Sequence, residues 1–279
     1  MPAHPLACGV HHYENFPVAS WLCPPRLRPA IQAIYYFART ADDIADEGDA
    51  SPRQRLDDLN QYHFDLLSCT QAGFVSTRWP AVFSALGPTI TQFELPVPLL
   101  ADLLSAFAQD VRQNHYATQA ELNDYCRRSA NPIGRLLLHL YGITDEAALA
   151  QSDCICTALQ LINFWQDLSV DLARGRIYLP QDAMLWHHVT QSQLLALEHT
   201  PDTTNLIADN ALYAWALMLK GSQLVKKIPG RAGWELRLVV QGGLRMLDQI
   251  DAAQGRTLLR RPKLRWWNAP LMLWRAVWM

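Results

Sequence analysis

Two groups of acidic side chains are the part of this sequence best suited to chemistry. The first lies in YYFARTADDIADEGD, where the acidic residues follow directly behind an apolar, aromatic run. Residues three and four apart share one face of a helix. On this spacing one face carries Tyr35, Arg39, Asp42 and Asp46, with Asp43 at its side. Like charges so placed destabilise an isolated helix by about 0.2–0.5 kcal/mol per pair, which favours a compensating cation. The alternative is a solvated acidic helix end.

A second polar face is predicted in CTALQLINFWQDLSVDLARGRIYLP. This face carries Gln160, Asn163, Asp167 and Asp171, at offsets of three, four and four. Apolar residues surround it in the sequence, so we expect it to lie beside a core rather than in open water. A buried carboxylate pair without a partner is unfavourable and normally binds a metal or a base. The two carboxylate faces are therefore expected to meet across the cavity of a helical bundle.

The ligand types favour magnesium as the metal. Oxygen ligands without nearby His or Cys suit Mg²⁺, which keeps waters and binds through carboxylates and substrate phosphates. A di-iron bundle would use Glu-x-x-His motifs, and the sequence has none. Arg174 and Arg176 follow the second face directly, and their guanidinium groups could bind the same anion as the metal.

Helical periodicity extends over most of the chain. PPRLRPAIQAIYYFARTADDIADEG begins with prolines and stops at Gly48, and the next helix has Ser51 as N-cap and Pro52 at its first position. Strand alternation bounded by hairpin turns is hard to find. Further helical stretches are expected near 77–87, 97–114, 118–141, 145–172, 203–227 and 231–254. The prediction is one all-α domain over residues 1–279, a helical bundle with a central active-site cavity.

Composition indicates a globular protein of the cytoplasm. Half of the residues are hydrophobic, 18% are charged, and the net charge of −2 gives no indication of nucleic-acid binding. No apolar run of about 18 residues or more predicts a transmembrane helix, and the first residues lack the pattern of a secretory signal. The six cysteines are scattered without a C-x-x-C motif, which favours reduced thiols.

The last segment, residues 261–279, differs from the rest of the chain. RPKLRWWNAPLMLWRAVWM has four tryptophans and several basic residues among Leu, Met and Val. Trp beside basic residues suits a membrane surface, so peripheral contact with the inner membrane is one interpretation. The alternative is a terminal helix that closes the core of the bundle.

DDIAD and NFWQDLSVD resemble the paired aspartate motifs of the squalene/phytoene synthase family, all-α enzymes that join or rearrange prenyl diphosphates. RGRIYLP is similar to the family's continuation after its second motif, and the likeness covers nearly the whole chain. The resemblance implies an isoprenoid-synthase bundle. It implies that Mg²⁺ and diphosphate are held by Asp42, Asp43, Asp46, Asn163, Asp167 and Asp171. It also implies substrate-anion contacts at Arg39, Gln160 and Arg176. Tyr35 on the first face and Arg174 just after the second face are further candidates for binding the substrate.

Departures from the family pattern narrow the expected reaction. The family's Ser-x-Ser-Phe segment reads YENFPVAS here, which makes substrate-binding candidates of Tyr13, Asn15 and Phe16. The arginine usual before the second aspartate motif is Gln166. These features resemble the branch that converts presqualene diphosphate to the alcohol hydroxysqualene. That resemblance implies presqualene diphosphate as substrate and leaves open an association with other enzymes of the squalene pathway.

A third departure follows DYCRR, whose Tyr125 is implied as the catalytic tyrosine. The family's small apolar stretch is replaced by SANPIG, so Ser129 and Asn131 place hydrogen-bonding groups where an apolar lining is expected. Pro132 cannot donate to the Arg128 carbonyl, so we expect a kink there. Such groups could hold a water that attacks a carbocation; the alternative is a structural helix break. The candidate catalytic residues are Tyr125, Asp42, Asp46, Asp167, Asp171, Ser129 and Asn131.

Two other functions are compatible with these residues. One is the condensation of two prenyl diphosphates to squalene or phytoene, catalysed by another member of the family. The other, from a different class, is a helical scaffold at the membrane periphery that has lost its chemistry. Intact aspartates in both motifs argue against the scaffold.

Overall fold

The computed structural model describes residues 23–279, and within this range the regular structure is helical. The N-terminal half contains α1 (Arg28–Asp46), α2 (Pro52–Ser68), α3 (Pro80–Phe93), α4 (Val97–Asp110), α5 (Gln119–Ser129) and α6 (Asn131–Leu140). The C-terminal half contains α7 (Glu146–Ala173), α8 (Gln181–Trp186), α9 (Gln191–Leu195), α10 (Pro201–Gly221), α11 (Gly230–Ala252) and α12 (Ala269–Val277), with short 3-10 turns at Ser222–Lys226, Arg256–Leu258 and Trp266–Asn268. The predicted all-α class is confirmed.

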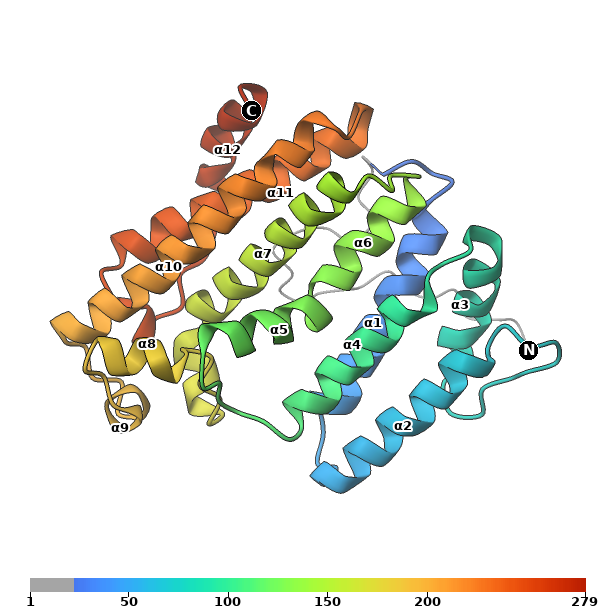
Figure 1. Cartoon of the computed structure of the whole chain (residues 1–279), viewed down its shortest axis with the longest axis horizontal. Coiled ribbons are helices and arrows are strands. Elements are labelled where there is room, and N and C mark those ends of the chain that lie inside the picture. The colour runs from blue at the N-terminus through green and yellow to red at the C-terminus, as the bar shows by residue number, and fades with distance from the viewer. Residues whose placement is uncertain (1–22) are drawn as a thin grey trace.

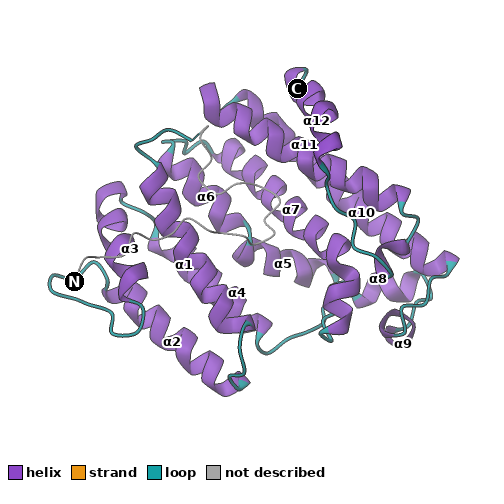
Figure 2. Ribbon diagram, turned by 180° about the vertical axis from the view of Figure 1, so that it is seen from behind, coloured by secondary structure: helices purple, strands orange, loops and turns teal. Residues whose placement is uncertain are grey.

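The helices pack as two groups that share α5, α6 and α7 at the centre of the molecule. Figures 1 and 2 show α1 to α4 on one side and α10, α11 and α12 on the other. Each group has its own apolar core: Phe37 and Tyr62 lie in the first, and Leu161 and Trp165 lie in the second. The two helices that carry the acidic faces, α1 and α7, therefore bury their apolar sides in different cores.

The long helix α7 is positioned by close packing against α10. Gly221, at the end of α10, lies so near α7 that an added Cβ would stand 2.6 Å from the carbonyl oxygen of Gln151. Asp145 caps α7 by accepting a hydrogen bond from the backbone N–H of Ala148. The 28-residue helix is thus held at its first turns, and its far end extends to the acidic residues.

Two expectations about helix boundaries need correction. The stretch expected at 118–141 is two helices, which meet at Ala130. Pro132 begins α6, where its missing N–H leaves no helical hydrogen bond unmade, so the predicted kink is a complete break. Helix α3 continues through Pro88 to Phe93, beyond the predicted end at residue 87. The predicted caps at Ser51 and Pro52 are confirmed, because Ser51 and Gln54 form a capping box.

The chain after α11 first passes α7, which contacts the 3-10 turn at Arg256–Leu258. It then ends in α12, which packs back against α11. Among residues 23–279, we find no helix that combines the length and the apolar character needed to cross a membrane. The five cysteines in this range are free thiols, as expected.

Candidate active site

The first acidic face, on α1, is neutralised partly by its own helix. The guanidinium group of Arg39 lies 3.1 Å from a carboxylate oxygen of Asp42 and 2.6 Å from one of Asp43. Burial raises the pKa of Asp42 to about 6, and the positive charge of Arg39 opposes this effect. Arg39 pairs with the residues three and four positions later, as the helical spacing predicted. The positive charge that compensates these two carboxylates is therefore an arginine of the same helix.

The turn after α7 connects the two acidic faces. Gly175 has a φ of +73°, a conformation that favours glycine, and it turns the chain so that both flanking arginines reach α1. Arg174 lies 3.0 Å from a carboxylate oxygen of Asp46, and Arg176 forms a still closer ion pair with the other oxygen. Backbone hydrogen bonds from Arg176 to Asp171 and from Ile177 to residue 114 fix this turn. The structure therefore brings the two predicted faces together through arginines.

The predicted catalytic tyrosine has a buried carboxyl partner. The hydroxyl of Tyr125 donates a hydrogen bond of 2.8 Å to Asp110, the last residue of α4. Burial raises the pKa of Asp110 to about 7, although this hydrogen bond and the charge of Arg176 lower it. The negative charges of Asp42 and Asp46 raise the pKa of Asp110, so Asp110 interacts electrostatically with the first acidic face.

Sequence reasoning missed Asp110. It lies inside the helical stretch expected near 97–114, at the end of LLSAFAQD, and no local pattern marks it as part of a site. The carboxyl belongs to the site because α4 packs against α5, which places it beside a residue 15 positions further along the chain.

Aromatic rings enclose Tyr125. The ring centroid of Tyr116 is 5.5 Å away, and those of Phe164 and Tyr178 are 6.2 and 6.4 Å away. Phe164 and Tyr178 stack on each other with centroids 3.7 Å apart. The faces of aromatic rings attract cations, so this lining can stabilise a carbocation while it excludes water.

Polar atoms near Tyr125 remain without protein partners. Within residues 23–279, the structure gives no hydrogen bond to the second oxygen of Asp110 or to the hydroxyl of Ser129. Ser129 follows Tyr125 by four residues on α5, so the two share a helical face. Buried polar groups normally have partners, and these atoms are therefore suited to bind water or substrate.

The second acidic face, on α7, contacts the tail. A nitrogen of Arg261 lies 3.0 Å from a carboxylate oxygen of Asp167, and the amide of Gln166 donates to the carbonyl of Pro262 at 2.9 Å. Burial raises the pKa of Asp167, which the charge of Arg261 opposes. Burial and the negative charge of Asp167 raise the pKa of Asp171 to about 7. Sequence reasoning placed Arg261 in a possible membrane segment; the structure places its charge on Asp167.

The other predicted residues occupy different positions. Asn131 is buried, and its side-chain oxygen accepts a hydrogen bond of 3.0 Å from Thr157. Tyr35, Gln160 and Asn163 are half-buried, and their contact with substrate stays a prediction. Predictions at three further positions lie outside the described residues, namely Tyr13, Asn15 and Phe16.

The carboxylate set fits magnesium by its chemistry. All candidate ligands are oxygens, and burial raises the pKa of Asp42 and Asp171 more than the nearby arginine charges lower it. Among residues 23–279, the side chains are not arranged so that three His, Cys, Asp or Glu residues could together hold a metal ion. Arginines pair with Asp42, Asp43, Asp46 and Asp167. A metal would therefore have to exchange places with arginine side chains.

Fold and site together define an all-helical isoprenoid synthase, with carboxylates and arginines from α1 and α7 and the turn after it, near a cluster of aromatic rings. A model of the squalene/phytoene synthase family matches residues 10–268. This chain belongs to the squalene/phytoene synthase family.

Relatives of the chain are found among named proteins of this family. It is 34% identical to the hydroxysqualene synthase of Sinorhizobium fredii, over 88% of this chain and 81% of that protein. It is also 34% identical to the hydroxysqualene synthase of Rhodopseudomonas palustris, over 90% of this chain and 85% of the other. The crystal structure of a squalene synthase from Alicyclobacillus acidocaldarius superimposes with a TM-score of 0.80 at 36% identity, covering 87% of this chain and 90% of that chain.

Proposed function

We propose that this chain converts presqualene diphosphate to hydroxysqualene and releases diphosphate. The observation that carries the proposal is the pair of unpartnered buried oxygen atoms near Tyr125, one on Asp110 and one on Ser129. A site that only guards a carbocation from water has no use for such atoms, whereas a site that adds water needs them. The names of the two relatives at 34% identity support the same reaction.

The first step is loss of the diphosphate group. The C–O bond breaks, and its electron pair leaves with diphosphate, whose negative charge Arg39, Arg174 and Arg176 can bind. Magnesium, when bound, would neutralise further charge on the leaving group. The residues that would hold it are Asp42, Asp43, Asp46, Asn163, Asp167 and Asp171.

The second step is rearrangement and capture of the cation. Phe164, Tyr178 and Tyr125 face the cation as its cyclopropane ring opens. A water held by Ser129 then forms the new C–O bond, with Asn131 near the same helix junction. The water loses one proton, which Asp110 or the departing diphosphate accepts. No electron carrier is needed, because one C–O bond to diphosphate is broken and one C–O bond to water is formed. The reaction therefore involves no net oxidation or reduction.

The decisive experiment is product analysis. Purified protein is incubated with presqualene diphosphate and Mg²⁺ in ¹⁸O-labelled water, with and without NADPH. We expect labelled hydroxysqualene in both cases. Squalene formed only with NADPH would support the second candidate, which the name of the similar Alicyclobacillus acidocaldarius structure favours. Turnover of two farnesyl diphosphates to phytoene-like or squalene-like products would also contradict the proposal. If the chain were a scaffold, no diphosphate would be released.

Ser129→Ala tests the water-binding role. Because the Ser129 hydroxyl is buried without a partner among the described residues, its removal should leave stability unchanged or slightly higher. We expect product to shift from the alcohol towards alkenes formed by proton loss. A tenfold shift needs only about 1.4 kcal/mol between competing transition states. Ser84→Ala is the control, since it removes an exposed serine hydroxyl on α3 and leaves Ser129 and Asn131 intact. An unchanged alcohol fraction in Ser129→Ala would exclude this hydroxyl as the water site.

A further inference from the structure

The C-terminal segment, residues 256–279, is strongly basic. It contains six Lys and Arg residues and no Asp or Glu, although the whole chain has a net charge of −2. Arg261 and Arg275 form ion pairs with Asp167 and Asp248. Arg260 and Arg265 are exposed at the surface. The segment thus presents positive charge on a protein that is otherwise acidic.

Helix α12 turns an apolar face outward. Leu273, Trp274, Val277 and Trp278 are 52%, 64%, 55% and 73% exposed, whereas Ala276 is buried against the protein. At 3.6 residues per turn, the exposed apolar positions cover an arc of roughly 140°. A surface helix of a globular protein normally has the opposite arrangement, with its apolar side inward.

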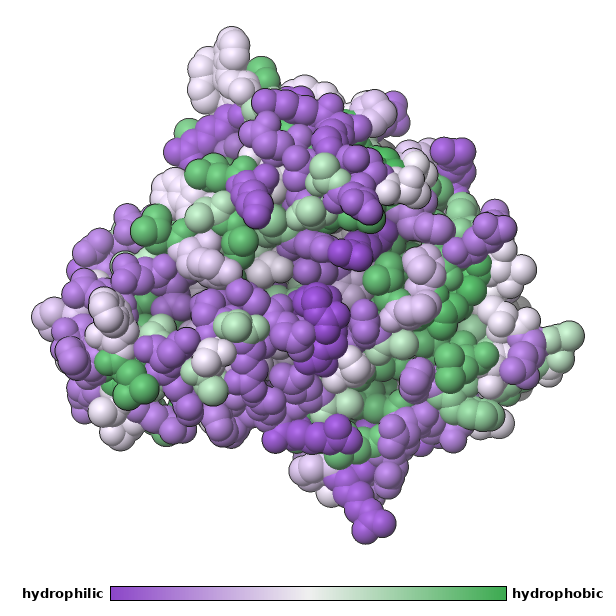
Figure 3. Space-filling view, in the orientation of Figure 1, coloured by the Kyte–Doolittle hydropathy of each residue, from purple (hydrophilic) through white to green (hydrophobic). Residues whose placement is uncertain are grey.

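Polar contacts from α11 hold α12 in this orientation. Arg237 donates hydrogen bonds to the backbone carbonyls of Ala276 and Met279, and Arg275 pairs with Asp248 at 2.9 Å. Arg245 donates a hydrogen bond of 2.8 Å to Asn268, which is buried just before α12. In Figure 1, α12 is the outermost helix beside α11, and the same end of the molecule projects in Figure 3 with pale and green side chains. The outward apolar face is therefore a fixed feature of the fold.

Two further tryptophans extend this face. Trp266 is 83% exposed, and Trp267 is 53% exposed with the guanidinium group of Arg265 4.9 Å from its ring centroid. Tryptophan with adjacent arginine is typical of the boundary between lipid and water, where the ring lies among the headgroups and the charge meets phosphate.

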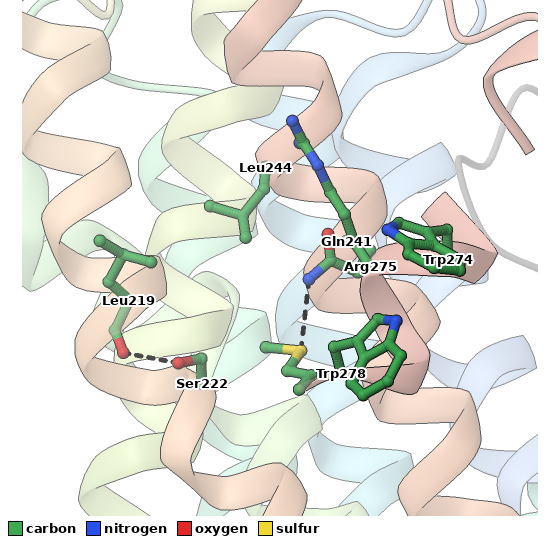
Figure 4. Close-up of a pocket in the computed structure, with 8 residues that line it drawn as sticks. Leu219, Ser222, Gln241, Leu244, Trp274, Arg275 and Trp278 are labelled. Atoms are coloured by element: carbon green, nitrogen blue, oxygen red, sulfur yellow. Dashed lines mark hydrogen bonds between the residues drawn. The ribbon is translucent and has the colours of Figure 1, made fainter. Parts of the chain in front are cut away.

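A groove continues the apolar surface towards α10. It has a volume of about 570 Å³ and is lined mainly by apolar side chains from α10, α11 and the end of the chain. Figure 4 shows Trp274 and Trp278 side by side at one edge, with Leu219 and Leu244 across from them. None of the predicted active-site residues lines this groove.

We propose that this tail surface, formed by Arg260, Arg265, Trp266, Trp267, Leu273, Trp274, Val277 and Trp278, docks on an anionic lipid membrane. Positive charge and exposed tryptophan together match a negatively charged bilayer surface. A symmetric contact with a second copy would bring two basic segments together, which is unfavourable. The contact between Arg261 and Asp167 joins the start of the tail to the acidic face of α7. The inference does not depend on which reaction the site performs.

The test is flotation of the full chain with vesicles. One set is pure phosphatidylcholine, and the other contains about one third phosphatidylglycerol. We expect at least about tenfold more binding to the anionic vesicles, and a decline as salt screens the charges. Trp266→Ala/Trp274→Ala/Trp278→Ala should lose about tenfold or more of this binding while diphosphate release from dispersed substrate is unchanged. Arg260→Gln/Arg265→Gln should lose only the preference for anionic lipid.

Trp186→Ala is the matched control. Trp186 is 79% exposed at the end of α8 and lies outside the tail surface, so its replacement should leave vesicle binding unchanged. Helical circular dichroism and size-exclusion chromatography are measured for each variant, and Trp266→Ala alone serves if the triple variant misfolds. Equal vesicle binding by wild type and the tryptophan variants would overturn the proposal. Absence of vesicle binding by wild type would overturn it as well. A wild-type dimer that the triple variant converts to a monomer, without vesicle binding, would assign the surface to a second copy and also overturn it.

Discussion

Replacing Asp110 by Asn should make the stability of the protein less sensitive to pH. Burial raises the pKa of the Asp110 carboxyl from its usual 3.8 to about 7. The folded protein therefore retains this proton to a higher pH than the unfolded chain, and the free energy of unfolding falls as pH rises through that window. Asn has the same shape, carries no charge, and still offers an oxygen to the Tyr125 hydroxyl.

The size of the effect follows from the same pKa. One pKa unit corresponds to about 1.4 kcal/mol, so between about pH 5 and about pH 8 ionisation of Asp110 lowers the free energy of unfolding by about 2–3 kcal/mol. Burial also raises the pKa of Asp42 and Asp171, to about 6 and about 7, and these groups contribute a slope of the same sign. In Asp110→Asn, only the part of this pH dependence that comes from Asp110 should disappear.

Urea unfolding followed by circular dichroism measures this directly. Wild type, Asp110→Asn and the control Asp102→Asn are compared at several pH values between about 5 and 8. Asp102 lies on the same helix, about two turns earlier, so it controls for loss of an α4 carboxylate. Parallel stability curves for wild type and Asp110→Asn would show that Asp110 is not a buried, protonated group at pH 5, and would refute the raised pKa given to it.

Two other outcomes are expected. Asp42→Ala and Asp167→Ala should each reduce diphosphate release by at least about 100-fold with the helical content unchanged, and EDTA should inhibit wild type reversibly; near wild-type rates at saturating Mg²⁺ would contradict the two-face site. Arg261→Gln should lower the free energy of unfolding by about 1–3 kcal/mol because it leaves Asp167 half-buried without its ion pair, whereas exposed Arg260→Gln should change it by less than about 0.5 kcal/mol. Equal values for the two arginine variants would show that the contact of the tail with α7 does not contribute to stability.

Local spacing in the sequence was sufficient to predict the helices and their polar faces. Asp42 and Asp46 share a face because they are four residues apart, and the same holds for Asp167 and Asp171. The break before Pro132 was also predictable, since proline cannot continue the preceding helix. These are properties of a few consecutive residues, and no distant part of the chain is needed to establish them.

Only the tertiary structure decided which charges meet. Arg174 and Arg176 pair with Asp46 across 128 and 130 positions of sequence, and Arg261 reaches Asp167 across 94. Such contacts depend on the direction in which helices pack and on the turn at Gly175, neither of which any local pattern encodes. The same reason explains why Asp110 was missed and why the tail's tryptophans were ambiguous. Periodicity describes how a helix presents its own side chains, whereas burial and partners come from the elements that pack around it.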